Sequence, residues 1–148
     1  MEQEVIIAVH PFFPWTRPTQ RKGLDLPPNY EVGLQRLLEE YSGAILVLEE
    51  EDGILEAQKR MPENPQGPRE LIATRNYNPF PKIMGSIGLD KYLREKGIKE
   101  IQLIGGYFIE QEPRAGCVGA MVDWLEECKF KVQLQRELLY SVRPLIRT

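Results

Sequence analysis

"IQLIGGYF", residues 101–108, is the segment of the chain that decides its fold. An apolar run of this length that ends in glycines is typical of a buried strand running into a turn. Residues 90–98 before it predict the end of a helix, with Gly97 at the position of a C-cap. Residues 115–128 after it predict a second helix, so the segment is a strand between two helices.

The same alternation extends in both directions along the chain. Further strands are predicted at residues 5–9, 44–48, 71–74 and 129–140, and further helices at residues 34–41 and 54–60. Strands that alternate with helices favour a mostly parallel sheet with helices on both faces, so the predicted fold class is α/β. A length of 148 residues without an internal repeat indicates a single domain, residues 1–148.

Composition excludes two classes of partner. The net charge is -3, whereas nucleic-acid binding relies on clustered Lys and Arg, so no nucleic-acid partner is expected. No apolar run approaches the roughly 20 residues that cross a bilayer, and the first residues are acidic where a signal peptide is basic. We therefore expect a cytoplasmic protein without a membrane partner.

The sequence gives no indication of a metal or another cofactor. Two cysteines and one histidine are too few for a closed structural zinc site. The acidic run at residues 49–52 could bind a cation, but such a run at a strand end is more typical of a solvated loop or of the first turn of the next helix. The glycines of residues 101–108 lack the dinucleotide fingerprint, and no phosphate-binding loop is present.

Cys117 is the first candidate for chemistry. A cysteine at a helix start has its thiolate stabilised by unpaired N–H groups and by the helix dipole. Gly116 beside it would let a substrate approach amides that could hold an oxyanion. The alternative is a small buried residue that fills space between helix and sheet. Cys128 lies at the helix C-terminus, where the dipole disfavours a thiolate, and is interpreted as structural.

The end of the first predicted strand carries the second group of candidates. His10 could take a proton from a thiol, or its ring could be satisfied by a nearby backbone carbonyl. The long loop after it carries Phe13 and Trp15, then Arg17, and could form a lid with an aromatic wall and cationic residues for an acidic substrate. Alternatively, these exposed aromatic residues could be covered by a second subunit, which would make the protein a homo-oligomer.

Residues 70–140 resemble the isochorismatase-like superfamily of cysteine hydrolases. The shared pattern is a helix ending in glycine, a strand with a glycine turn, a Cys-Val pair that opens the next helix, and an aromatic residue thirteen positions after the cysteine that begins the following strand. Cys117, Val118 and Phe130 match it in type and spacing. The resemblance implies a three-layer α/β/α sandwich, hydrolysis of a small amide or related carbonyl compound, and a habit of homo-oligomerisation.

In that family the cysteine acts with an aspartate after the first strand and a lysine after the third. Here His10 stands at the position that resembles the aspartate, and Thr74 and Arg75 stand near that of the lysine. Two hypotheses follow. In the first, the chain is a hydrolase in which Cys117 is the nucleophile, His10 the base and Arg75 the cation. In the second, it is a diverged scaffold that acts by binding a small molecule or by assembly.

Overall fold

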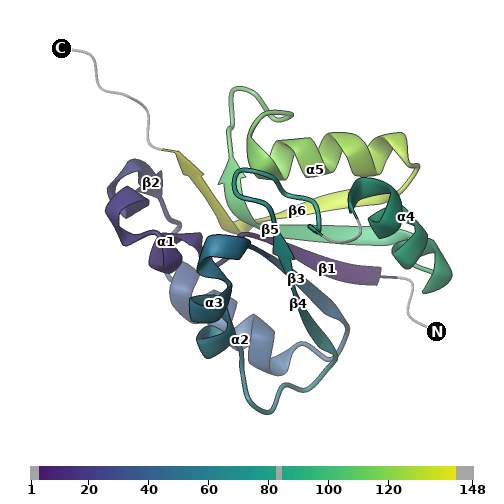
Figure 1. Ribbon diagram of the computed structural model, residues 1–148. Coiled ribbons are helices and arrows are strands. Elements are labelled where there is room, and N and C mark those ends of the chain that lie inside the picture. The colour runs from purple at the N-terminus through teal and green to yellow at the C-terminus, as the bar shows by residue number, and fades with distance from the viewer. Residues whose placement is uncertain (1–3, 83–84, 143–148) are drawn as a thin grey trace.

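A computed structural model describes residues 4–82 and 85–142, and its centre is a six-stranded sheet (Figure 1). The strand order is β2-β6-β5-β1-β3-β4. All neighbouring strands are parallel except β2, which pairs antiparallel with β6. The strands are β1 (Glu4–Val9), β2 (Leu24–Asp25), β3 (Ile45–Glu50), β4 (Arg69–Thr74), β5 (Glu100–Phe108) and β6 (Lys131–Val142).

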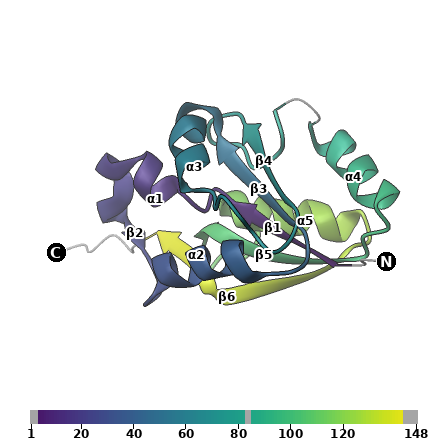
Figure 2. The ribbon, with the colours of Figure 1, turned by 90° about the horizontal axis from the view of Figure 1, so that it is seen from below.

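Helices cover both faces of the sheet, as Figures 1 and 2 show from two directions. On one face lie α4 (Gly85–Glu95) and α5 (Gly116–Glu127). On the other lie α1 (Phe13–Thr16), α2 (Tyr30–Glu40) and α3 (Ile54–Arg60). The predicted α/β class and the three-layer sandwich with a mostly parallel sheet are therefore confirmed.

The two cores follow from the alternation of side chains along the central strands. In β1, Val5, Ile7 and Val9 pack with α4 and α5, whereas Ile6 and Ala8 pack with α2 and α3. All five are buried, because a strand in the middle of such a sheet has a hydrophobic layer on each side. The apolar run at residues 5–9 is therefore explained by burial on both faces.

The segment between β1 and α2 differs from the sequence-based expectation of a long irregular loop. It contains α1, a 3-10 helix (Pro18–Gly23) and the short strand β2. These elements are too short, and too rich in proline, to leave a periodic hydrophobic pattern in the sequence. They bring the segment back across the end of the sheet, where it forms part of the wall of a pocket.

The second correction concerns β3, which runs two residues beyond its predicted end at residue 48. Glu49 and Glu50 belong to the strand and are buried, so the acidic run does not begin as a solvated loop. Only Glu51 and Asp52 leave the sheet, in a 3-10 helix (Glu51–Gly53). Two carboxyl groups are thus placed inside the protein at the end of a central strand.

Within residues 4–82 and 85–142, none of the helices has both the length and the apolar character needed to span a bilayer.

Candidate functional site

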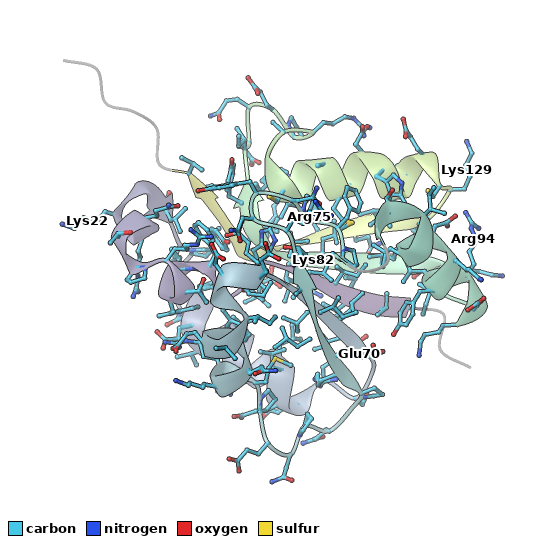
Figure 3. The ribbon with its side chains drawn as sticks, in the orientation of Figure 1. Lys22, Glu70, Arg75, Lys82, Arg94 and Lys129 are labelled. Carbon is cyan, nitrogen blue, oxygen red and sulfur yellow. The ribbon has the colours of Figure 1, made fainter. Side chains whose placement is uncertain are left out.

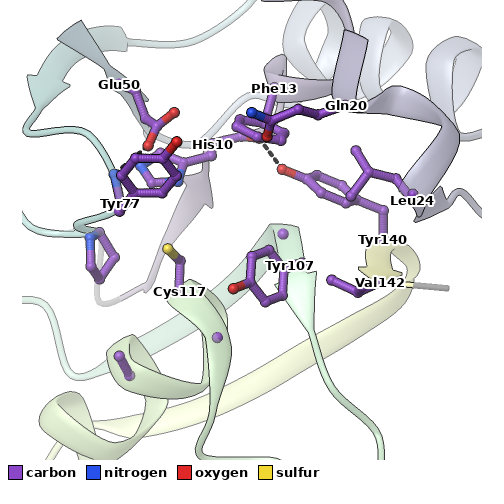
Figure 4. Close-up of a pocket in the computed structure, with 15 residues that line it drawn as sticks. His10, Phe13, Gln20, Leu24, Glu50, Tyr77, Tyr107, Cys117, Tyr140 and Val142 are labelled. Atoms are coloured by element: carbon purple, nitrogen blue, oxygen red, sulfur yellow. Dashed lines mark hydrogen bonds between the residues drawn. The ribbon is translucent and has the colours of Figure 1, made fainter. Parts of the chain in front are cut away.

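A pocket of about 470 Å³ opens at the edge of the sheet where the parallel strands have their carboxyl ends (Figure 4). This is the edge at which open α/β sheets bind ligands. Its lining combines the last residues of β3, β5 and β6 with residues that follow β1 and β4, with the first turns of α5, and with parts of the segment between β1 and α2. Among the lining residues are Phe13, Tyr77, Tyr107, Tyr140, His10, Glu50 and Cys117.

Cys117 occupies the first turn of α5 and lines the pocket. Gly116 before it has a φ of 76°, and a Cβ at that position would come within 2.6 Å of the backbone oxygen of Tyr107. Only glycine tolerates both conditions, so Gly116 lets α5 begin directly beside the end of β5. Figure 4 shows the thiol of Cys117 pointing into the pocket, toward the side that carries His10 and Glu50.

The surroundings of Cys117 do not activate its thiol in the resting protein. Burial raises its pKa to about 11, and the negative charge of Glu50 adds to this rise. The helix-start position was expected to lower this pKa, but the apolar lining and the neighbouring carboxylate act in the opposite direction. Cys117 is therefore a protonated thiol at neutral pH. The pKa of Cys128 is also raised, first by its burial.

His10 is held by hydrogen bonds at its ring and at its backbone. Its Nε2 lies 2.9 Å from Oγ1 of Thr74, and the backbone of Asn78 forms a further hydrogen bond with the ring. Its carbonyl oxygen accepts a hydrogen bond of 2.7 Å from the hydroxyl of Tyr140, drawn as a dashed line in Figure 4. Burial lowers the pKa of His10 to about 4, so the imidazole is neutral at pH 7. This arrangement corresponds to a histidine satisfied by neighbouring groups.

Glu50 is a pocket carboxylate that the sequence did not single out. Its side chain is only 2% exposed, and its Oε2 accepts a hydrogen bond from the backbone N–H of Tyr77. Its Oε1 forms an ion pair of 3.2 Å with Arg17 and has no hydrogen-bond partner among the described residues. Glu50 therefore presents one oxygen that is paired by charge alone.

Glu49 points to the opposite side of β3 and is fully buried. Its carboxyl group accepts hydrogen bonds from the backbone N–H of Phe12 at 2.9 Å and from that of Glu50 at 3.3 Å. Burial raises its pKa to about 8, although both hydrogen bonds oppose the rise. Glu49 is thus mostly protonated at neutral pH and is not a lining residue of the pocket.

The other sequence-predicted site residues separate into two groups. Gly116 and Phe13 line the pocket with Cys117 and His10. Trp15 instead stacks on Tyr30 with ring centroids 6.0 Å apart, and it lines a different cavity against α2. Phe13 and Trp15 are both half-buried, and of the two only Phe13 faces the pocket, because the segment folds back onto α2 at Trp15.

The two arginines among the predicted site residues have different positions. Arg17 is not a lining residue of the pocket, but it pairs with the lining residue Glu50 and, at 3.4 Å, with Asp52. Arg75 is exposed and is not among the lining residues (Figure 3). Thr74, its neighbour in the sequence, is buried and contacts His10. The arginine that pairs with a lining residue is therefore Arg17, from another part of the chain, and not Arg75.

Sequence reasoning missed four lining residues with polar side chains besides Glu50. They are Gln20, Tyr77, Tyr107 and Tyr140, which come from four different segments. The one available signal was the place of Tyr77 and Tyr107 just after predicted strands, at the edge where the ligand site was expected. No group of three or more His, Cys, Asp or Glu residues that could hold a metal ion occurs in the part of the chain that the structure describes.

Comparisons with known proteins bear on the fold alone. No family model matches the chain, and no curated protein matches its sequence. The crystal structure of the nicotinamidase SaPncA from Staphylococcus aureus is similar to it, with a TM-score of 0.53 and 16% identity. The similarity covers 96% of this chain and 86% of that chain. The chain therefore has an isochorismatase-like fold.

Proposed function

We propose that the pocket is the active site of a cysteine hydrolase that acts on a small amide or related carbonyl compound. The observation that carries the proposal is the position of Cys117, whose thiol points into a pocket at the carboxyl edge of the sheet from the first turn of α5. The isochorismatase-like fold supports it, because a solved neighbour of the same fold is named as a nicotinamidase.

In the proposed reaction, Sγ of Cys117 attacks the carbonyl carbon of the bound substrate. The N–H groups in the first turn of a helix have no partner within the helix, and those near Gly116 and Cys117 are the donors that would hold the developing oxyanion. The amine leaves, and water then hydrolyses the thioester. Because burial raises the pKa of the thiol to about 11, its proton must leave while sulfur attacks rather than beforehand.

The pocket limits the kind of substrate. Its walls carry four aromatic side chains, those of Phe13, Tyr77, Tyr107 and Tyr140, and its one lining carboxylate is Glu50. No lysine or arginine lines it within the described residues, so an acidic substrate would have no cation to pair with in the pocket. A small uncharged compound with a flat carbonyl group fits this lining. The earlier expectation that Arg17 contacts an acidic substrate has less support, since Glu50 and Asp52 pair with it.

Covalent labelling tests the proposal without knowledge of the natural substrate. The protein is mixed with p-nitrophenyl acetate at neutral pH, and the acetylated residue is identified by peptide mass spectrometry. We expect transient acetylation of Cys117, release of p-nitrophenolate, and loss of both in Cys117→Ala but not in Cys128→Ala. Ammonia release from nicotinamide and from acetamide then tests the amide class. Unchanged p-nitrophenolate release in Cys117→Ala would exclude Cys117 as the nucleophile.

The second candidate function is binding of a small molecule without chemistry. It is favoured by the raised pKa of Cys117 and by the hydrogen bonds that hold the His10 ring. A protein of this kind would show no acetylation of Cys117, while a ligand that fills the pocket would raise the melting temperature of the wild type and of Cys117→Ala alike.

A further inference from the structure

The hydrolase needs a group that accepts the proton of Cys117, and the pocket offers few. The ring of His10 already forms hydrogen bonds with Thr74 and with the backbone of Asn78. The remaining polar side chains of the lining are the amide of Gln20, which is not basic, the phenols of three tyrosines, and Glu50. A carboxylate is the only one of these that is a proton acceptor at neutral pH.

A hydrogen bond and an ion pair hold the carboxylate of Glu50 in one position, as a general base requires. The N–H of Tyr77 fixes Oε2, and the guanidinium of Arg17 lies 3.2 Å from Oε1. Arg17 is in turn held at 3.4 Å by Asp52 and lies 5.9 Å from the ring centroid of Tyr77. With its side chain only 2% exposed, Glu50 has few rotamers available, so its oxygens keep a fixed position at the pocket wall.

Glu50 and Cys117 also act on each other electrostatically. Burial is the larger cause of the raised pKa of the Cys117 thiol, and the negative charge of Glu50 is the second cause. Figure 4 shows the sulfur pointing toward the side of the pocket where the Glu50 carboxylate lies. The negative charge of Glu50 disfavours a thiolate at Cys117. When Glu50 takes the proton of the thiol, its carboxyl group becomes neutral, so the proton transfer removes the repulsion.

We propose that Glu50 accepts the proton of Cys117 during attack and that Arg17 is the positioning residue that holds Glu50; this inference rests on the proposed hydrolase function. As the S–C bond forms, the thiol proton moves to Glu50, directly or through one bridging water. Glu50 gives that proton to the leaving nitrogen as the C–N bond breaks. Water then attacks the thioester, Glu50 takes a proton from the water, and this proton returns to sulfur as the C–S bond breaks.

The test compares Glu50→Gln with Glu56→Gln, both in a Cys128→Ala background. Glu56→Gln is the matched control, because it makes the same change at a carboxylate of α3 that pairs with Arg60 and does not line the pocket. With p-nitrophenyl acetate as the probe, we expect acetylation of Cys117 to slow by about 100-fold or more in Glu50→Gln, the usual scale of general-base catalysis, and by less than about threefold in Glu56→Gln.

A second readout separates a base from a merely structural residue. The ultraviolet absorbance of the thiolate gives the pKa of Cys117 in both variants. Loss of the negative charge should lower this pKa in Glu50→Gln, so that the thiol becomes more acidic while acetylation becomes slower. Equal or faster acetylation in Glu50→Gln, with Cys117→Ala still inactive, would overturn the role of Glu50 and leave the cysteine hydrolase standing. If Cys117→Ala is as active as the wild type, the proposed function itself fails.

The wild type provides a test if Glu50→Gln does not fold. Reaction through a free thiolate would make the acetylation rate rise about tenfold per pH unit up to the pKa of Cys117, about 11. Proton transfer to a carboxylate predicts a rate that changes by less than about threefold per unit between pH 7 and 9. The charged or titratable groups around Glu50 include Arg17, Glu49, Cys117 and Tyr140, together with His10 in the lining of the same pocket. Glu49→Gln removes the titration of the neighbouring carboxyl group from the profile. A tenfold rise per unit would overturn the proposal.

Discussion

His10 shows how a single residue joins several parts of this molecule. Its backbone has a φ of 45°, and its N–H donates a hydrogen bond of 2.7 Å to the carbonyl of Leu48. Its carbonyl accepts hydrogen bonds from the hydroxyl of Tyr140 and the N–H of Phe13, and its ring contacts Thr74. The residue therefore fixes the turn after β1 against β3, β4 and β6 at once.

Tyr140→Phe tests this connection. It removes a buried hydrogen bond of 2.7 Å, and we expect the free energy of unfolding to fall by about 1 kcal/mol. The N–H of Phe13 still donates to the same carbonyl at 3.2 Å, which keeps the loss small. Urea denaturation measures it. Tyr107→Phe is the control, since no hydrogen bond of its hydroxyl is found among the described residues, and it should change the free energy by less than about 0.5 kcal/mol.

The sequence could identify single candidates but not their partners. Cys117 and His10 were found because each follows a recognisable element, and both line the pocket. Glu50 was missed because a carboxylate at a strand end is ordinarily solvated. Its burial depends on Arg17, which lies 33 residues earlier in the chain and reaches Glu50 only through the packing of α1. Arg75 was chosen by sequence position, and that position points to solvent.

At the scale of the element, β1 and β5 approach each other at Gly105 too closely for a side chain there. Gly105 has a φ of 100°, and a Cβ built there would lie 2.0 Å from the backbone oxygen of Val9. The pairing of β5 with β6 is also irregular here, with a register shift between Leu103 and Gly105. The glycine is thus required for β5 to leave the sheet beside the pocket.

Gly105→Ala should therefore be strongly destabilising. The added methyl group cannot be accommodated without moving β1 or β5, so we expect a loss of about 3 kcal/mol or more, seen as a lower urea midpoint or as failure to fold. Gly23→Ala is the matched control, because no atom lies within 4 Å of a Cβ at that position. A loss in Gly105→Ala no larger than in the control would mean that β5 does not approach β1 this closely.

Most long elements could be predicted, whereas the short ones could not. Residues 54–60 and 115–128 were predicted as helices, and α3 and α5 agree to within one residue at each end. Their apolar residues recur with the helical period because each helix buries one face. The helix α1 has four residues and the strand β2 has two, so neither is long enough for its hydrophobic pattern to repeat. Their conformations depend on tertiary contacts, such as the stacking of Trp15 on Tyr30.

At the scale of the whole molecule, two buried titratable groups give stability an unusual pH dependence. The pKa of His10 is about 4 in the folded protein and 6.5, its ordinary value, in the unfolded chain. Between these pH values the unfolded chain binds more protons, so the free energy of unfolding rises with pH. The pKa of Glu49 is about 8 in the folded protein and 4.5, its ordinary value, in the unfolded chain. Between these pH values the folded protein binds more protons, so the free energy of unfolding falls as the pH rises. The two effects oppose each other up to pH 6.5.

Above that pH the effect of Glu49 remains alone. We expect the free energy of unfolding to be nearly level from about pH 4.5 to 6.5 and then to fall by about 2 kcal/mol up to pH 8. Urea denaturation across this range measures it. Glu49→Gln should remove the fall above pH 6.5, whereas Glu40→Gln, at an exposed position of α2, should not. A wild type that gains stability from pH 6.5 to 8 would contradict a neutral, buried Glu49.

The short pairing of β2 with β6 also bears on strand pairing between copies of the molecule. Leu24 and Asp25 pair with Val142 and Ser141 alone, so the earlier part of β6 has no partner on its outer side within the described residues. An open strand edge is a template for aggregation, and natural proteins protect such edges with charged side chains and bulges. Here the register shifts between β5 and β6 are such irregularities, and the exposed residues of β6 include Lys131, Arg136 and Glu137. The longest strand of the sheet is thereby guarded against edge-to-edge polymerisation.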